Sequence, residues 1–226
     1  MCVNYLPASR EELENDFNAP VQGEFDWKAE TWQDYPAPII IGQEGRRKAV
    51  VGLYSMIPKA HIPPGVKRFS TMNARAESID TLRSYAKHWR EGRLCLVPMT
   101  RFFEPNYESG SPVRWKIAMA DASPFAVAGL YRTWEEPDGT ESFSFTQITI
   151  NAEDHPLMRR FHKPGAEKRS LVIVPAGDYD HWLECRDSER ARTYLRHYPV
   201  ELMAAMPAPK DASKKSENAV NQSLFG

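Results

Sequence analysis

The feature that most constrains the fold is a series of short apolar segments joined by connections too short to hold a helix. Residues 142–150 alternate strictly, with Phe143 and Phe145 on one face, and the turn signal Asp138-Gly139 precedes them. Parallel neighbours need a crossover of about a dozen residues or more, so these short connections predict antiparallel pairing. The other expected strands cover residues 36–41, 46–54, 93–97, 113–120, 125–131 and 171–174.

Helices are few in this pattern. Ser9-Arg10-Glu11-Glu12 is a capping-box sequence and predicts a short helix that reaches about Phe17. Strands outnumber helices, which predicts an α+β fold, a single domain over residues 1–206 with a largely antiparallel sheet and flanking helices. Residues 207–226 have little to bury and are expected to form a flexible tail. The remaining expected helices cover residues 80–91, which Gly92 would end, 154–160 and 187–195.

Composition limits the compartment and the partners. The net charge of this 226-residue chain is −1, so a polyanion would have to be held by a local patch, such as one from residues 45–116, with 14 Lys and Arg against 5 Asp and Glu. Three cysteines, no leader and no long apolar run predict a cytoplasmic protein without a membrane span. Cys95 and Cys185 lack metal-ligand spacing and are expected to be packing residues, so no metal and no cofactor are expected.

Cys2 is the cysteine whose backbone nitrogen can become a free amine, since methionine aminopeptidases remove Met1 when the second side chain is small. An α-amine titrates at about 7.7–8.0 and a thiol near about 8.5, so both are partly available as nucleophiles near neutral pH. Together they form a 1,2-aminothiol, which can convert an aldehyde first to a Schiff base and then to a thiazolidine ring. A cysteine at position 2 can also be an accident of an exposed chain start.

Three polar clusters lie next to predicted strand or helix ends. Residues 72–77 include Asn73, which can donate and accept together, and Arg75, whose guanidinium suits a phosphate. Glu104 follows two aromatic residues, which predicts a partly desolvated carboxyl group that holds a proton near neutral pH, as a general acid requires. His162 lies in a loop between cations. Alternatively, residues 72–77 are a helix start with surface charges, and His162 is a surface residue.

Together with Cys2, these clusters resemble the SRAP family, the SOS-response-associated peptidases also called abasic site processing proteins, over roughly residues 2–200. The resemblance rests on the Met-Cys start and four ordered motifs. The motifs are Asn73 to Ser78 for Asn-Ala-Arg-Ala-Glu-Thr, Cys95 to Pro105 for Cys-Leu-Val-Pro…Phe-Tyr-Glu-Trp, Phe161-His162-Lys163 for Ile-His-x-Arg-Met-Pro, and Tyr54 to Pro58 for Trp-Gly-Leu-Ile-Pro.

The resemblance implies a barrel-like sheet and a covalent chemistry. Family members bind single-stranded DNA containing an abasic site and capture its aldehyde as a thiazolidine DNA–protein crosslink. By this resemblance Cys2 is the nucleophile, Asn73 orients it and the sugar, Glu104 protonates the ring oxygen, and His162 assists at the Schiff base. The residues expected to contact DNA are Arg75 at a phosphate, Tyr54, Met56, Pro58 and Lys59 near the bases, and Arg169.

Further expectations follow from the same resemblance. The protein would be a monomer that reaches nucleoid DNA after damage, with the replication machinery as a partner, and lyase activity could accompany the crosslink. Two alternatives stay open, a cysteine peptidase that also removes its own Met1 and a non-covalent single-strand binding module. The chain departs from the family at Val3 and Asn4, which replace a glycine and a phosphate-binding arginine, at Pro105, and at residues 164–168, which separate His162 from Arg169.

Overall fold

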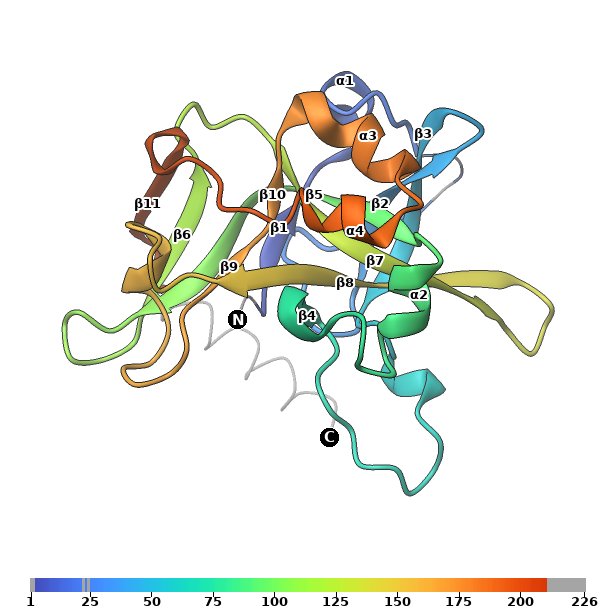
Figure 1. The fold of residues 1–226 in the computed structure, drawn as a ribbon, viewed down its shortest axis with the longest axis horizontal. Helices are drawn as coiled ribbons and strands as arrows, with labels where there is room; N and C mark the ends of the chain where they lie inside the picture. Colours follow the sequence, from blue (N-terminus) through green and yellow to red (C-terminus); the bar gives the residue numbers. More distant parts are fainter. Residues whose placement is uncertain (1–2, 22, 24, 211–226) are drawn as a thin grey trace, which may run out of the picture.

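Five strands close into a barrel because β5 pairs with strands at both ends of the ring (Figure 1). A computed structural model describes residues 3–21, 23 and 25–210 of the chain. The ring runs from β5 through β7, β8, β3 and β2 back to β5, and only β3 and β8 pair in parallel within it. Its members are β2 (Pro36–Gln43), β3 (Arg46–Tyr54), β5 (Leu94–Asn106), β7 (Phe125–Glu135) and β8 (Glu141–Asn151).

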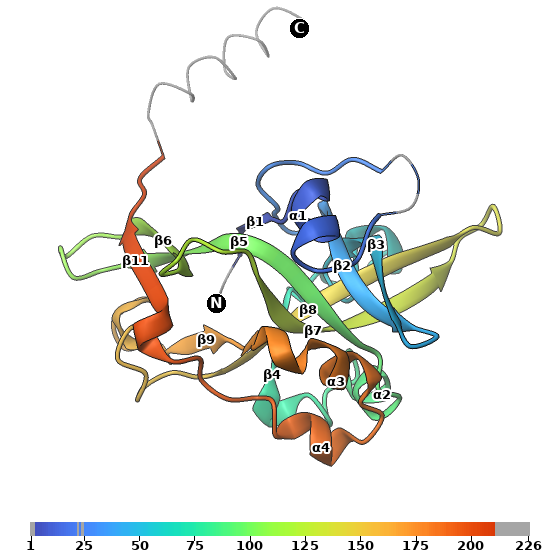
Figure 2. The ribbon, with the colours of Figure 1, turned by 90° about the horizontal axis from the view of Figure 1, so that it is seen from above.

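Shorter strands extend the barrel and confirm the prediction of a largely antiparallel, barrel-like α+β domain. They are β1 (Tyr5–Pro7) and β6 (Val113–Met119) on β5, β4 (Asn73–Arg75) and β9 (Arg169–Leu171) on β8, β10 (Ile173–Val174) on β7, and β11 (Met203–Pro207) on β6. Figure 2 shows β6 and β11 on one side of the barrel and the β7–β8 hairpin extending from the other. The described part of the chain contains no helix with the length and apolar character needed to cross a membrane.

The helices are short and lie outside the barrel. They are α1 (Arg10–Asn15), α2 (Ala86–Arg90), α3 (Tyr179–Glu184) and α4 (Ser188–Arg192). The capping box that predicted α1 is present, since Ser9 Oγ accepts from the N–H of Glu12 at 3.2 Å and Glu12 accepts from the N–H of Ser9 at 2.7 Å. The expected helix over residues 80–91 is shortened to α2, because Leu82 is exposed and adds nothing to the buried face.

The β2–β3 hairpin turns through two residues with left-handed backbone. Glu44 has a φ of 52° and Gly45 a φ of 70°, the combination that fits the twist of a two-residue hairpin. The hairpin predicted at Asp138-Gly139 is present, since β7 and β8 pair from Gly129 with Gln147 to Glu135 with Glu141, on both sides of this turn. The turn signal at Asp138-Gly139 therefore marks a tight antiparallel connection, as predicted.

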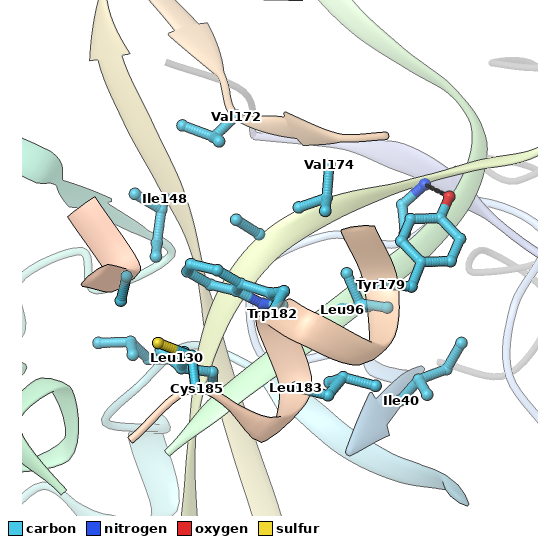
Figure 3. Packing of buried hydrophobic residues seen from close by; sticks show 14 of the residues in the cluster. Ile40, Leu96, Leu130, Ile148, Val172, Val174, Tyr179, Trp182, Leu183 and Cys185 are labelled. Carbon is cyan, nitrogen blue, oxygen red and sulfur yellow. Dashed lines mark hydrogen bonds between the residues drawn. The ribbon is translucent and has the colours of Figure 1, made fainter. Parts of the chain in front are cut away.

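Two hydrophobic cores lie on opposite faces of the barrel strands. On β5, Leu94 and Leu96 pack in the cluster that contains the helices, and Cys95 and Val97 pack in the other. The helices cannot lie inside a five-stranded ring, so the second cluster fills the interior. Figure 3 shows the helix-side cluster, in which Trp182 lies among residues of the barrel strands. Its indole N–H donates to the Cys95 carbonyl at 2.9 Å, which fastens α3 to β5.

Several elements differ from the expectations. Strand β5 was expected over residues 93–97 but continues to Asn106, so Glu104 lies within a strand and not beyond its end. The expected helix over residues 154–160 is reduced to a 3₁₀ turn, Met158–Arg160. Strand β1, helix α3 and strand β11 were not expected, because segments of three to six residues carry too little periodicity to be recognised.

Gly129 tests the packing of the barrel interior. A Cβ there would lie 2.7 Å from the Thr146 carbonyl oxygen and 2.9 Å from Cys95 Sγ. We expect Gly129→Ala to lower the free energy of unfolding by about 2 kcal/mol, measured by urea denaturation, because neither neighbour can move away easily. Gly177→Ala is the matched control, since no atom lies within 4 Å of its Cβ, and it should change stability by less than about 0.5 kcal/mol. Equal effects would contradict a tightly packed interior.

Candidate active site

Glu104 and His162 form a buried acid–base pair. The Glu104 side chain projects from β5 and is 3% exposed, the His162 side chain is 8% exposed, and Nε2 of His162 lies 3.3 Å from Oε2 of Glu104. Phe102 and Phe103, which precede Glu104, are buried with it. The desolvation of Glu104 expected from its aromatic neighbours is therefore present, and the alternative of a surface histidine at position 162 is wrong.

The backbone of His162 is held in an uncommon conformation. Its φ of 69° lies in the left-handed region that favours glycine. Its N–H donates to the Pro105 carbonyl at 3.0 Å, and Phe161 makes a bridge to Asn106, so this loop adds to the edge of β5. Because Pro105 and Asn106 directly follow Glu104, the same strand end holds both members of the pair.

Strand β1 brings the start of the described chain to the same strand. Tyr5 pairs with Phe102, and the N–H of Phe103 donates to the Asn4 carbonyl at 3.2 Å. Asn4, which stands where the family has an arginine, is buried, and its amide donates to Glu30. Met1 and Cys2 lie outside the described residues.

Asn73 lies on β4 directly beside β8. It pairs in register with Gln147, a fully buried glutamine whose Oε1 accepts a hydrogen bond from the Tyr54 hydroxyl at 2.9 Å. The Tyr54 ring stacks on Phe145 and meets Tyr5 of β1 edge-on, with centroids 5.3 Å apart in both pairs. Contacts from Asn73 through Gln147 and Tyr54 therefore reach Tyr5 of β1. Strand β1 pairs with β5, the strand that carries Glu104.

Gln147 was not singled out from the sequence, although a signal was present. It occupies the face of the alternating segment that also carries Phe143 and Phe145, where a polar residue must be buried. Among the described residues its Nε2 has no hydrogen-bond partner, and neither does Nδ1 of His162. Buried polar atoms of this kind are usually satisfied by a ligand or by water. Both atoms are candidates to contact a polar substrate.

The arginines expected to contact DNA differ in exposure. The Arg75 side chain is 46% exposed, and its Nη1 lies 2.6 Å from Glu167, so its partner is not the neighbouring Glu77. The Arg169 side chain is 2% exposed and donates to both oxygens of Glu77, at 2.9 Å each, and to the Thr149 carbonyl at 2.7 Å. The geometry fits a phosphate contact by Arg75 and a structural role for Arg169.

The expected DNA-contact residues between Tyr54 and Lys59 also differ in exposure. Tyr54, Met56 and Pro58 are buried, so in this conformation they support the surface and do not form it. Lys59 is exposed and opens a loop in which Val66 and Phe69 are each more than half exposed. Lys67 and Arg68 lie between these two apolar side chains. An exposed surface of this composition can stack on bases and attract phosphates.

Nothing in the described residues suggests a metal site, since no three His, Cys, Asp or Glu side chains gather there in a suitable arrangement. Cys95 and Cys185 are free and buried, in agreement with the expected packing role. Burial raises the pKa of the Cys95 thiol, which keeps this sulfur protonated and unreactive.

Solved structures first define the class of fold. A crystal structure of a protein from Bordetella bronchiseptica matches 92% of this chain and 99% of its own, with a TM-score of 0.80 and 30% identity. A protein from Bacteroides thetaiotaomicron shares the fold with a TM-score of 0.76 and 21% identity, over 96% of each chain. The barrel with its added strands is thus a recurrent architecture.

Sequence comparison then gives the family. The chain belongs to the SRAP family, whose model, described as SOS response associated peptidase, matches residues 1–215. Among curated relatives, the Bacillus subtilis abasic site processing protein YoqW is 28% identical over 151 residues, 64% of each protein, so the match spans less than two thirds of that relative. The abasic site processing protein YoaM of the same organism is 26% identical over 173 residues, 71% of this chain and 73% of YoaM.

The Arg169 cluster provides a stability test. Burial raises the pKa of Glu77, but the hydrogen bond and charge of Arg169 outweigh it, so the net pKa is lowered. We expect Arg169→Met to cost about 2 kcal/mol in urea denaturation at pH 7, because several charged hydrogen bonds are lost. Because the pKa of Glu77 is lower in the folded state, its carboxylate stabilises the fold at a pH above the pKa of the unfolded state. This stabilisation is lost as the pH falls through the pKa of the folded state. The stability difference between wild type and Arg169→Met should therefore shrink below about pH 4.5.

Arg160→Met is the control for this experiment. Arg160 pairs with Glu108 at 2.8 Å, but both side chains are substantially exposed. Its removal should cost less than about 1 kcal/mol. A deficit for Arg169→Met no larger than that of Arg160→Met would contradict a structural role for Arg169.

Proposed function

We propose that this protein captures abasic sites in single-stranded DNA as a covalent thiazolidine through Cys2. The observation that carries the proposal is the buried pair of His162 and Glu104, with Glu104 on the strand beside Asn4. Two peptide units link Cys2 to Asn4, whose carbonyl accepts from the N–H of Phe103 next to Glu104, and this connectivity supports the proposal. The names of the relatives YoqW and YoaM support the substrate class.

Glu104 has the environment of a general acid for the first step. The sugar at an abasic site is mostly a closed hemiacetal, and the aldehyde forms when the C1′–O4′ bond breaks, the C1′ hydroxyl loses its proton and O4′ gains one. Glu104 is buried, its Oε2 lies 3.3 Å from Nε2 of His162, and it is the residue proposed to deliver the proton to O4′. His162 can receive the proton released at the C1′ hydroxyl and return it to Glu104.

Capture then needs both nucleophiles of Cys2. The α-amine adds to C1′, and loss of one water leaves an imine. The sulfur adds to the imine carbon, the thiol proton passes to the nitrogen, and the five-membered ring closes. The net reaction releases one water molecule and uses no cofactor. Asn73, which can donate and accept hydrogen bonds together, is proposed to orient the sugar and Cys2.

The flanking strand of DNA is proposed to follow the exposed cations. Arg75 would exchange the carboxylate of Glu167 for a phosphate, and Lys59 opens the loop that presents Val66 and Phe69. Stacking of a base on such a side chain is worth about 1–3 kcal/mol. Phosphate contacts fix position and register, and carry no sequence preference.

A cysteine peptidase is the second candidate, and the family description, SOS response associated peptidase, favours it. An amino-terminal cysteine beside an acid–base pair could also attack a peptide carbonyl. The two functions separate when the same preparation is incubated with an abasic oligonucleotide and with peptide substrates.

The roles of three residues can be separated on one denaturing gel. Glu104→Gln should slow crosslinking to an abasic single strand by about 10²- to 10⁴-fold, since a positioned proton donor contributes that much. Cys2→Ala keeps the amine, so we expect a Schiff base that borohydride traps and no heat-stable adduct. His162→Ala should be slower than wild type, with an unchanged product.

Two controls belong to this gel. Intact mass of the active protein should show that it begins at Cys2, since a retained Met1 would leave no free amine at that residue. An oligonucleotide with a reduced abasic sugar lacks the aldehyde and should give no adduct. A heat-stable adduct from Cys2→Ala at the wild-type rate would exclude the Cys2 thiol, and with it the thiazolidine.

Arg75 is expected to bind a DNA phosphate and to take no part in the crosslinking chemistry. We expect Arg75→Ala to weaken DNA binding and to reduce the slope of log affinity against log salt by about 0.7, one phosphate on a single strand. The crosslinking rate at saturating DNA should be unchanged. Arg46→Ala removes an exposed arginine at the β2–β3 turn and is the matched control. If Arg75→Ala leaves the salt slope at the wild-type value, Arg75 is only a partner of Glu167.

A further inference from the structure

Lys168 holds three consecutive carbonyl groups of the loop that carries His162. Its ammonium donates to the carbonyls of Phe161 at 2.9 Å, His162 at 3.2 Å and Lys163 at 3.4 Å. An ammonium has three N–H donors, so all of them are used on this loop. No carboxylate pairs with this ammonium in the described part of the chain, and the loop carbonyls are its partners there.

The position of Lys168 itself is fixed by the sheet. Its N–H donates to Glu153 at 3.0 Å, and its carbonyl accepts from the N–H of Ala152 at 2.8 Å. The next residue, Arg169, begins β9 and is anchored to Glu77. The backbone of Lys168 is therefore held in place, and its ammonium group extends from there to the loop carbonyls.

The His162 backbone requires such support. A φ of 69° is unfavourable for a residue with a side chain, so other contacts must hold this conformation. The N–H of His162 donates to the Pro105 carbonyl, and its own carbonyl accepts from the Lys168 ammonium. Three carbonyl oxygens that converge on one point repel each other without a cation between them. Loss of the ammonium would let the loop relax and carry the imidazole away from Glu104.

We infer that Lys168 is a positioning residue that keeps the His162 imidazole within reach of Glu104. The inference rests on the proposed function for its kinetic consequence, but the geometry itself can be measured on the free protein. Lys168 follows residues 164–167 in the segment that separates His162 from Arg169. This segment therefore supplies the lysine that holds the His162 loop. Lys168 is proposed to touch neither the substrate nor the reacting atoms.

The test compares Lys168→Met, which keeps the length and removes the donors, with Lys168→Arg, which keeps a cation. Lys168→Met should lower the maximal crosslinking rate by about tenfold at an unchanged half-saturating DNA concentration, since a misplacement of about 1 Å costs up to 10²-fold. Lys168→Arg should restore part of the loss. Lys163→Met, an exposed lysine of the same loop, is the control and should retain the wild-type rate.

A double-mutant cycle separates positioning from general damage. If Lys168 acts only through His162, adding Lys168→Met to His162→Ala should have no further effect on the rate. Additive losses would overturn the inference, and so would a wild-type rate for Lys168→Met.

A second readout does not depend on crosslinking. In the free protein labelled at histidine, the ring resonances of His162 should shift in Lys168→Met and stay in place in Lys163→Met, while those of the remote His181 are constant in both. Unchanged His162 resonances in Lys168→Met would contradict a positioning role for Lys168. Absence of any adduct from the wild-type protein would refute the proposed function, and the resonances would still decide the role of Lys168.

Discussion

The architecture depends on one long strand that pairs along both of its edges. Strand β5 closes the barrel against β2 and β7 in its first half, then continues past the ring and pairs with β1 and β6. Its early residues alternate between the helix-side core and the barrel interior. Its late residues place Glu104 where aromatic side chains exclude water and where the His162 loop adds to the strand end. Stability and the candidate chemistry therefore share one element.

The site is assembled from segments distant in the chain, and each is held by main-chain contacts. Asn4 is fixed by the N–H of Phe103, Asn73 by its register with Gln147, and His162 by the Pro105 carbonyl. Such contacts do not depend on the identity of the side chains, so the frame tolerates the replacements that distinguish this chain from the family pattern. Pro105 illustrates this, because its carbonyl is what the His162 loop uses.

Ion pairs in the same region have unequal roles. Arg169 is buried and satisfies two carboxylates and a carbonyl, which ties β9 to β8 and to the residues after β4. Arg75 is half exposed and, among the described residues, pairs with the carboxylate of Glu167. A buried arginine with several acceptors is difficult to free, whereas an exposed pair is worth little and can exchange its partner for a phosphate. Exposure, and not residue type, distinguishes the structural arginine from the candidate ligand contact.

The sequence by itself determined the local structure and the kinds of chemistry available. The turn signal at Asp138-Gly139 predicted the β7–β8 hairpin, and the alternation of residues 142–150 predicted β8. The capping box predicted α1, and the aromatic neighbours of Glu104 predicted its burial. These features depend on residues close in the chain. Only the tertiary structure decided that β5 runs on to Asn106, that His162 meets Glu104, that Arg169 is buried, and that Lys168 holds the loop. These outcomes depend on pairings between strands far apart in sequence, and the energy of such a contact appears only once the chain has closed on itself.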